Sequence, residues 1–192
     1  MRMRRFVLLD RDGTLIAERN YLTRVEEVEL LPATARGLRL LNHLGLGLAV
    51  LTNQSGLGRG YFDGAALDAI HTRLSRLLAD EGISLAGIYV CPHVPEDDCD
   101  CRKPRPGLAR RAAAELNFDP AASFVIGDKA CDIELGRCLG ATTFLVRTGY
   151  GTVQEQNGVR ADYVVDDMLA AAHIIRALVS REATACSPRA AS

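Results

Sequence analysis

The stretch FVLLDRDGT, from Phe6 to Thr14, decides the fold of this chain. Its four apolar residues, Phe6–Leu9, have the length and composition of a short buried strand, which Asp10 ends abruptly. Gly13 allows the backbone to turn sharply away from that strand. Ligands of open parallel α/β sheets bind at the carboxyl ends of the strands. The stretch therefore predicts such a sheet, with a polar site where its first strand ends.

The rest of the chain alternates short apolar runs with helical patterns, as parallel α/β sheets do. Further strands are predicted at Leu48–Leu51, Ile88–Val90, Phe124–Ile126, Phe144–Val146 and Tyr163–Val165. Helices are predicted at Ala33–Leu44, Ala65–Asp80, Pro106–Leu116, Asp132–Leu139 and Met168–Val179. We expect an α/β fold: a single Rossmann-like parallel sheet with helices on both faces. One domain would span residues 1–182, followed by a disordered tail over residues 183–192.

The composition is that of an ordinary globular protein. The 192 residues are 48% hydrophobic and 24% charged, and the formal net charge of −1 offers no field to attract nucleic acid or an anionic membrane. The apolar run near the N-terminus is shorter than the roughly 7–15 residues of a signal peptide, and no run approaches the roughly 20 of a membrane span. Six cysteines, three of them clustered with a histidine, indicate metal ligands in a reducing compartment. The expected location is the cytoplasm.

Polar residues gather at four comparable places, each at the end of a predicted strand. They are Asp10 and Asp12; Thr52, Asn53, Gln54 and Ser55; Arg102 and Lys103; and Asp128, Lys129 and Asp132. Any one of these clusters alone would more often be a solvated turn or a helix cap. Because the carboxyl ends of parallel strands lie along one side of a sheet, we expect all four to converge on one site.

The chemistry of these clusters agrees with phosphoryl transfer. Asp10 and Asp12, with Asp128 opposite them, offer the hard oxygen ligands that Mg²⁺ prefers. One carboxylate can act as a nucleophile and form an aspartyl-phosphate. The Thr52 hydroxyl and the Lys103 ammonium can hold the oxygens of the phosphoryl group, whose transfer depends mainly on positioning and charge stabilisation.

The order of these motifs resembles that of the haloacid dehalogenase-like phosphatase superfamily. The matching motifs cover about residues 6–150 and are DRDGT at Asp10–Thr14, Thr52-Asn53, Lys103-Pro104 and GDKACD at Gly127–Asp132. The resemblance implies that Asp10 attacks phosphorus, while Asp12 protonates the leaving oxygen and later activates water. It implies Mg²⁺ held by Asp10, the backbone carbonyl of Asp12, and Asp128. It further implies that Thr52 and Lys103 hold the phosphoryl group, with Asp132 supporting the metal or Lys103.

A second constellation combines three thiols and one imidazole, those of Cys91, His93, Cys99 and Cys101. These ligand types suit tetrahedral Zn²⁺, and four protein ligands leave no open position for catalysis. We therefore expect a closed structural zinc site in the loop 91–105. The alternative is a loop that is merely rich in cysteine. Glu96–Asp98 are interpreted as its solvated tip, because zinc prefers the softer ligands.

Within the superfamily, the run CPHxPxxxCDCRKP is similar to two subfamilies. They are the D-glycero-D-manno-heptose 1,7-bisphosphate 7-phosphatases, which belong to lipopolysaccharide heptose biosynthesis, and the bacterial histidinol-phosphate phosphatases. GTLIAERNY at 13–21, VELLP at 28–32 and TNQSGLGRGYF at 52–62 look more like the heptose enzymes. The five residues between His93 and Cys99 equal the histidinol-type spacing. No cap domain is evident, and capless members have an open cleft.

The resemblance to the heptose enzymes implies a substrate-binding set of polar residues near the catalytic ones: Glu18, Arg19, Asn20, Tyr21, Asn53, Gln54, Ser55, Arg102 and Lys129. Arg102 suits a phosphate, because a guanidinium can grip phosphate oxygens bidentately. The alternative for Arg102 is a surface ion pair with Asp100 or another nearby acid. The expected partner is a small phosphorylated sugar, with no nucleic acid and no membrane, and we expect a monomer.

Two other classes of protein compete with this interpretation. A phospho-receiver domain also has acids, a threonine and a lysine at strand ends, but its phosphorylated aspartate usually lies on the third strand, where this chain continues into the cysteine-rich loop. A nucleic-acid-binding zinc module is disfavoured by the near-zero charge and by only 5% aromatic residues. The remaining histidines are interpreted as packed or solvated groups and the remaining cysteines as packed or free thiols, none with a catalytic role: His43, His71, His173, Cys131, Cys138 and Cys186.

Overall fold

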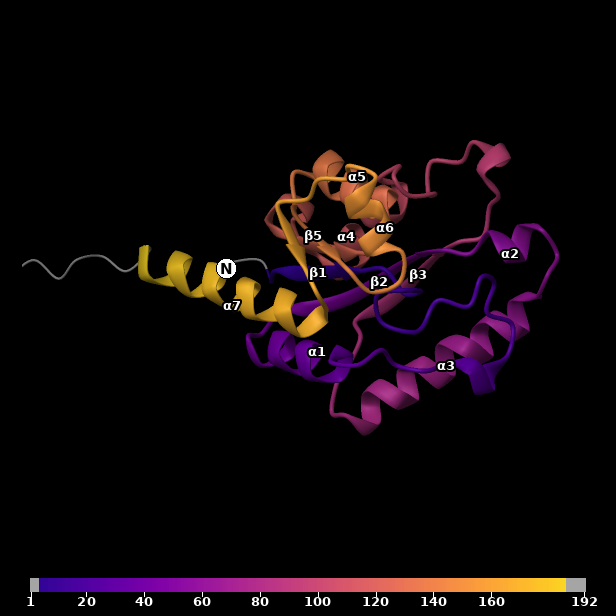
Figure 1. Ribbon diagram of the computed structural model, residues 1–192, viewed down its shortest axis with the longest axis horizontal. Coiled ribbons are helices and arrows are strands. Elements are labelled where there is room, and N and C mark those ends of the chain that lie inside the picture. Colours follow the sequence, from indigo (N-terminus) through magenta and orange to yellow (C-terminus); the bar gives the residue numbers. More distant parts are fainter. Residues whose placement is uncertain (1–3, 186–192) are drawn as a thin grey trace, which may run out of the picture.

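The computed structural model describes residues 4–185 and contains one six-stranded sheet in the order β3-β2-β1-β4-β5-β6, with every neighbouring pair parallel (Figure 1). The strands are β1 (Phe6–Leu9), β2 (Gly47–Asn53), β3 (Gly87–Cys91), β4 (Phe124–Gly127), β5 (Thr142–Val146) and β6 (Tyr163–Val165). The predicted parallel α/β sheet is confirmed.

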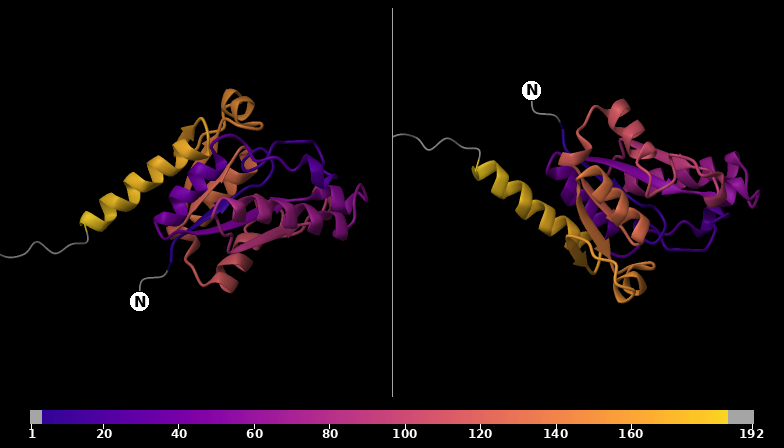
Figure 2. Two further views of the ribbon diagram at one scale, coloured as in Figure 1. Left: turned by 90° about the horizontal axis from the view of Figure 1, so that it is seen from below. Right: turned by 90° about the horizontal axis from the view of Figure 1, so that it is seen from above.

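Helices cover both faces of this sheet (Figure 2). They are α1 (Thr34–His43), α2 (Ser55–Gly58), α3 (Gly64–Asp80), α4 (Gly107–Leu116), α5 (Ala130–Leu139), α6 (Gly151–Gln156) and α7 (Met168–Ala185). Successive side chains of a strand point to opposite faces. Val7 and Leu9 of β1 accordingly pack in the core beneath α1, α3 and α7, whereas Phe6 and Leu8 pack in the core beneath α4 and α5. These two apolar layers hold the central strand rigidly in place.

The site lies where the order of the strands reverses. β1 is in the middle of the sheet, with β2 on one side and β4 on the other. The carboxyl ends of these three strands are therefore adjacent, and they present Asp10, Asn53 and Asp128 at one crevice. Ligands of doubly wound sheets bind at such a reversal.

The structure differs from the expected elements at their ends and in two short helices, α2 and α6, that the sequence pattern did not predict. β2 continues through Asn53, so Thr52 and Asn53 belong to the strand rather than to the loop after it. α7 continues through Ala185, beyond both the predicted helix end at 179 and the predicted domain end at 182, because the segment SREATA contains no helix breaker. The rest of the predicted tail, 186–192, including Cys186, lies outside the described residues. Within residues 4–185, we find no helix of the length and hydropathy that a membrane span requires.

Candidate active site

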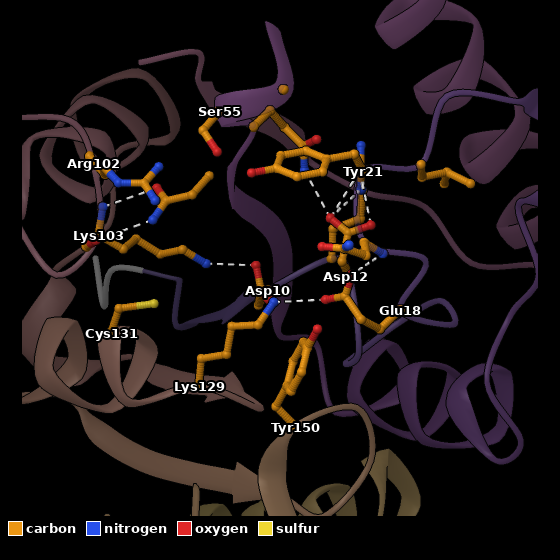
Figure 3. Close-up of a pocket in the computed structure, with 16 residues that line it drawn as sticks. Asp10, Asp12, Glu18, Tyr21, Ser55, Arg102, Lys103, Lys129, Cys131 and Tyr150 are labelled. Atoms are coloured by element: carbon orange, nitrogen blue, oxygen red, sulfur yellow. Dashed lines mark hydrogen bonds and ion pairs between the residues drawn. The ribbon is translucent and has the colours of Figure 1, made fainter. Parts of the chain in front are cut away.

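A pocket of about 300 Å³ opens at the carboxyl ends of the strands and contains most of the predicted site residues (Figure 3). Its walls come from five segments that are far apart in the sequence. They contribute Asp10, Arg11, Asp12, Glu18, Asn20, Tyr21, Leu22, Asn53, Gln54, Ser55, Gly56, Arg102, Lys103, Lys129, Cys131 and Tyr150. The structure thus brings the four polar clusters of the sequence to one place.

Lys103 joins two buried carboxylates at the floor of this pocket. Its Nζ lies 2.7 Å from Oδ1 of Asp10 and 2.7 Å from Oδ1 of Asp132, and it donates to the carbonyl of Leu51 at 2.6 Å. Burial alone would raise the pKa of Asp10, but the Lys103 and Lys129 ammonium groups outweigh it and hold that pKa below its ordinary value. Burial raises the pKa of Asp132 to about 6, although Lys103 opposes the rise. Asp10 is therefore the carboxylate held in its anionic form.

Asp128 has the environment of a cation ligand. Its Oδ2 accepts a hydrogen bond from the Tyr150 amide at 2.8 Å, whereas its fully buried Oδ1 has no hydrogen-bond partner. Burial, followed by the charge of Asp10, raises the pKa of Asp128 to about 8. Carboxylate oxygens of Asp10, Asp128 and Asp132 all lie within 4.8 Å of one another. This oxygen-only set, with one unsatisfied buried oxygen, fits the predicted Mg²⁺.

The carboxylate of Asp12 is held by neighbouring side chains and lies outside that group of oxygens. Arg11 donates to it through Nε at 3.0 Å and Nη2 at 2.9 Å, and Gln54 Nε2 donates to Oδ2 at 2.8 Å. Gln54 also donates to the Thr52 hydroxyl at 2.7 Å. Thr52 is buried beneath Gln54 and does not line the pocket, although the sequence predicted that it would face the phosphoryl group.

One rim of the pocket is the loop after β1. Lys129 Nζ bonds Glu18 Oε2 at 2.8 Å, and Glu18 Oε1 accepts from the Asn20 amide at 2.9 Å. Asn20 and Tyr21 both have positive φ, of 47° and 73°, which aims Tyr21 at the pocket (Figure 3). Arg19 does not line the pocket, because its guanidinium turns away to pair with Glu29 at 3.1 Å.

The opposite rim is the cysteine-rich loop after β3. The four ligand atoms lie close together, with Cys91 Sγ 3.6 Å from Cys99 Sγ, Cys101 Sγ 3.3 Å from Cys91 Sγ, and His93 Nδ1 3.3 Å from Cys101 Sγ. Zinc bonds of ordinary length would separate tetrahedral ligands by roughly 3.5–3.8 Å, so these residues fit that metal.

This loop also positions the cations that follow it. Arg102 donates through Nη1 to the His93 carbonyl at 3.2 Å. Asn53 fixes the next residue, because its amide group exchanges two hydrogen bonds of 3.1 Å with the backbone N–H and C=O of Lys103. No pair between Arg102 and Asp100 is observed among the described residues, and Arg102 lines the pocket.

Gly13 gives a direct test of how tightly the carboxylates are packed. It has φ of +81°, and a Cβ there would lie 2.2 Å from Oδ2 of Asp128. Gly13→Ala is expected to destabilise the protein by about 3 kcal/mol or more, from the left-handed backbone and the clash together. Gly82→Ala isolates the backbone cost, since Gly82 has φ of +70° with nothing within 4 Å of a Cβ, and should cost only about 1 kcal/mol. Urea unfolding measures both, and equal losses would contradict the close approach to Asp128.

Sequence reasoning did not predict that five lining residues would be part of the site: Leu22, Gly56 and the three that follow. Arg11 lies inside the DRDGT motif but was not assigned a role, and Tyr150 comes from the segment before α6, a short helix that has no clear periodicity. Cys131 was interpreted as a packed or free thiol with no place in the site, and it is a free cysteine at the pocket wall. The position of Arg11 between two candidate catalytic acids could have indicated that it belongs to the site.

Several proteins of known structure are similar to this chain in both fold and sequence. A family model described as HAD-hydrolase-like matches residues 100–171. A D,D-heptose 1,7-bisphosphate phosphatase from B. bronchiseptica, solved with magnesium and phosphate, is similar with a TM-score of 0.85 and 34% identity, over 91% of this chain and 99% of that one. The corresponding phosphatase from Burkholderia thailandensis has a TM-score of 0.71 and 31% identity, over 90% and 99% of the two chains.

These similarities place the fold among those of the haloacid dehalogenase-like hydrolases. The D-glycero-beta-D-manno-heptose-1,7-bisphosphate 7-phosphatase of Pasteurella multocida is 37% identical over 187 residues, which cover 93% of this chain and 100% of the relative. The chain belongs to the family of these heptose bisphosphate phosphatases. The resemblance inferred from the motifs is confirmed, as is the class of enzyme, a phosphatase.

Proposed function

We propose that the protein is a Mg²⁺-dependent phosphomonoesterase that removes the 7-phosphate of D-glycero-D-manno-heptose 1,7-bisphosphate through an aspartyl-phosphate. The observation that carries this proposal is the pair of buried carboxylates, Asp10 and Asp132, on the single ammonium of Lys103, beside the unpartnered oxygen of Asp128. This arrangement supplies an anionic nucleophile and a cation site within one pocket. Family membership adds the substrate, which is the one in the relatives' names.

In the first step, an Asp10 oxygen attacks phosphorus while the bond from phosphorus to the sugar oxygen breaks. Asp12 gives its proton to that departing oxygen. In the second step, water attacks the phosphorus of the aspartyl-phosphate, Asp12 takes a proton from the water, and the bond to Asp10 breaks to release inorganic phosphate. Lys103 holds Asp10 in place and stabilises the charge on the phosphoryl oxygens. Asp10, Asp128 and the carbonyl of Asp12 would hold Mg²⁺, which neutralises phosphate charge.

We propose that the cysteine–histidine cluster binds a zinc ion with a structural role. With Cys91, His93, Cys99 and Cys101 all as ligands, the metal has no open position for substrate or water. It would join the two ends of the loop and hold Arg102 at the rim. The same thiol ligands support a cytoplasmic location, since reducing compartments keep such thiols free. We further propose a monomer with no nucleic-acid or membrane partner; the near-neutral charge supports the absence of those two partners.

Substrate choice depends on the rim of the pocket. Arg102 and Lys129 both line it, and either cation suits a second phosphate. Histidinol phosphate, the alternative substrate, has no second phosphate and carries an ammonium group. Lys129 is already paired with Glu18, but Arg102 has no acidic partner among the described residues and therefore favours the bisphosphate.

A side-by-side assay of phosphate release tests the proposal. With Mg²⁺, heptose 1,7-bisphosphate should be hydrolysed with a kcat/KM at least about 100-fold above that for histidinol phosphate, which corresponds to roughly 3 kcal/mol of differential binding. Chelation of Mg²⁺ with EDTA should stop release, and its return should restore it. Preference for histidinol phosphate would contradict the proposed substrate, and absence of turnover on both compounds would contradict the proposed function. Phosphate retained on the protein without turnover would favour a receiver domain.

A further inference from the structure

Arg11 is a buried cation that connects the site to a surface helix. Only 1% of this residue is exposed. Two of its nitrogens bond Asp12, and the third, Nη1, lies 3.0 Å from Nε2 of His71 on α3. His71 does not line the active-site pocket. It lines a shallow groove along α3 together with Asp68, Thr72, Ser75, Arg76 and Ala79.

The contact fixes the chemical form of the histidine. A guanidinium carries only donors, so Nε2 of His71 must be the acceptor and the ring proton must lie on Nδ1. Burial, with the charge of Arg11 in addition, lowers the pKa of His71 to about 4. The ring is therefore neutral at ordinary pH and can accept this hydrogen bond throughout the working range of the protein.

The contact also fixes the guanidinium. Bidentate pairing sets the plane of the Asp12 carboxylate relative to the plane of Arg11. Without the histidine, a buried Nη1 would lose its acceptor, and the guanidinium would rotate to find another. Asp12 would then lose the geometry of its two strongest hydrogen bonds while Gln54 still held Oδ2.

We propose that His71 is a positioning residue for catalysis, which acts through Arg11 to hold the Asp12 carboxylate where it exchanges protons with the leaving group and with water. This inference rests on the proposed function, in which Asp12 is the acid and base. His71 touches neither the pocket nor the groups that hold the phosphate. Its loss should therefore affect the rate of the chemical step and not the binding of substrate.

Three variants separate this role from a purely structural one. His71→Leu removes the acceptor at similar volume, and kcat should fall about 10-fold or more while KM stays within about twofold, the scale seen for partners that orient reactive groups. His71→Gln keeps an acceptor oxygen and should recover most of the lost kcat. Ser75→Ala changes the same groove one helical turn away and should leave both constants unchanged.

The possible outcomes test the proposed function and the role of His71 separately. An inactive wild-type protein would overturn the proposed function, whereas an active wild type with unaltered kcat in His71→Leu would overturn the role of His71 alone. Equal losses in the Leu and Gln variants, accompanied by a lower Tm, would assign His71 a structural role instead. Nitrogen-15 NMR of the wild type gives an independent check. The His71 signals should show Nδ1–H with unprotonated Nε2 from pH 5 to 8, and titration at the ordinary value of 6.5 would exclude the contact with Arg11.

Discussion

Asparagine in place of Asp10 should lower phosphate release by on the order of 10⁴-fold or more, the scale of loss when a covalent nucleophile is removed. The amide is nearly the same size as the carboxylate but cannot form an aspartyl-phosphate. The protein should remain folded, because Lys103 keeps its 2.7 Å ion pair with Asp132 when the charge on Asp10 is gone. Circular dichroism and Tm should therefore match the wild type.

Glu134→Gln is the matched control for this loss. It makes the same carboxylate-to-amide change on the exposed side of α5, the helix that also carries Asp132, and should leave turnover unchanged. A second readout is acid-quenched labelling with a phosphorylated substrate, in which wild-type protein should carry label and the Asp10→Asn variant should carry none. Appreciable turnover by Asp10→Asn would remove Asp10 as the nucleophile.

Cys99→Ser should cost stability rather than a chemical step. Serine is a poor ligand for zinc, so the variant should lose the metal and roughly 3–5 kcal/mol of unfolding free energy, which for a chain of this size lowers the Tm by roughly 10 °C. Because the loop fixes Arg102 through the His93 carbonyl, KM should rise more than kcat falls. Zinc content, Tm and kinetic constants measure the three effects.

Cys138→Ser provides the control for sulfur loss, since Cys138 is a free, exposed thiol on α5 and lies outside the cysteine–histidine cluster. It should keep its zinc, its Tm and its activity. A folded, zinc-free Cys99→Ser protein with wild-type KM would show that the metal does not position the rim.

The sequence predicted the sheet, its two helical layers and the convergence of the polar clusters, because these follow from local periodicity and from where strands end. The central strand is the clearest case, since β1 spans Phe6–Leu9 as predicted. Helix ends were less predictable. α7 extends to Ala185 because its last residues are good helix formers, and sequence patterning gave no signal for where they stop.

The motifs did not predict the directions in which the side chains of the site point. Thr52 follows the expected motif, but Gln54 covers it with a 2.7 Å hydrogen bond. Arg19 lies in the correct loop and turns outward to Glu29. The contact between Arg11 and His71 joins residues 60 positions apart, which only the packing of α3 against the loop after β1 brings together. Long-range pairs of this kind depend on tertiary packing, not on local sequence.

The two halves of the cysteine–histidine cluster stand at either end of the segment that projects from β3. Cys91 and His93 lie at its beginning, and Cys99 and Cys101 lie at its end. The residues between His93 and Cys99 therefore form a loop closed at its base by the cluster, and no residue of that loop lines the pocket. Doubling a flexible loop costs only about 0.6 kcal/mol of closure entropy. An insertion in this loop would change what lies at the mouth of the pocket without moving Lys103 or any of the carboxylates. A zinc ion bound as proposed would thereby separate the length of the rim from the geometry of the pocket floor.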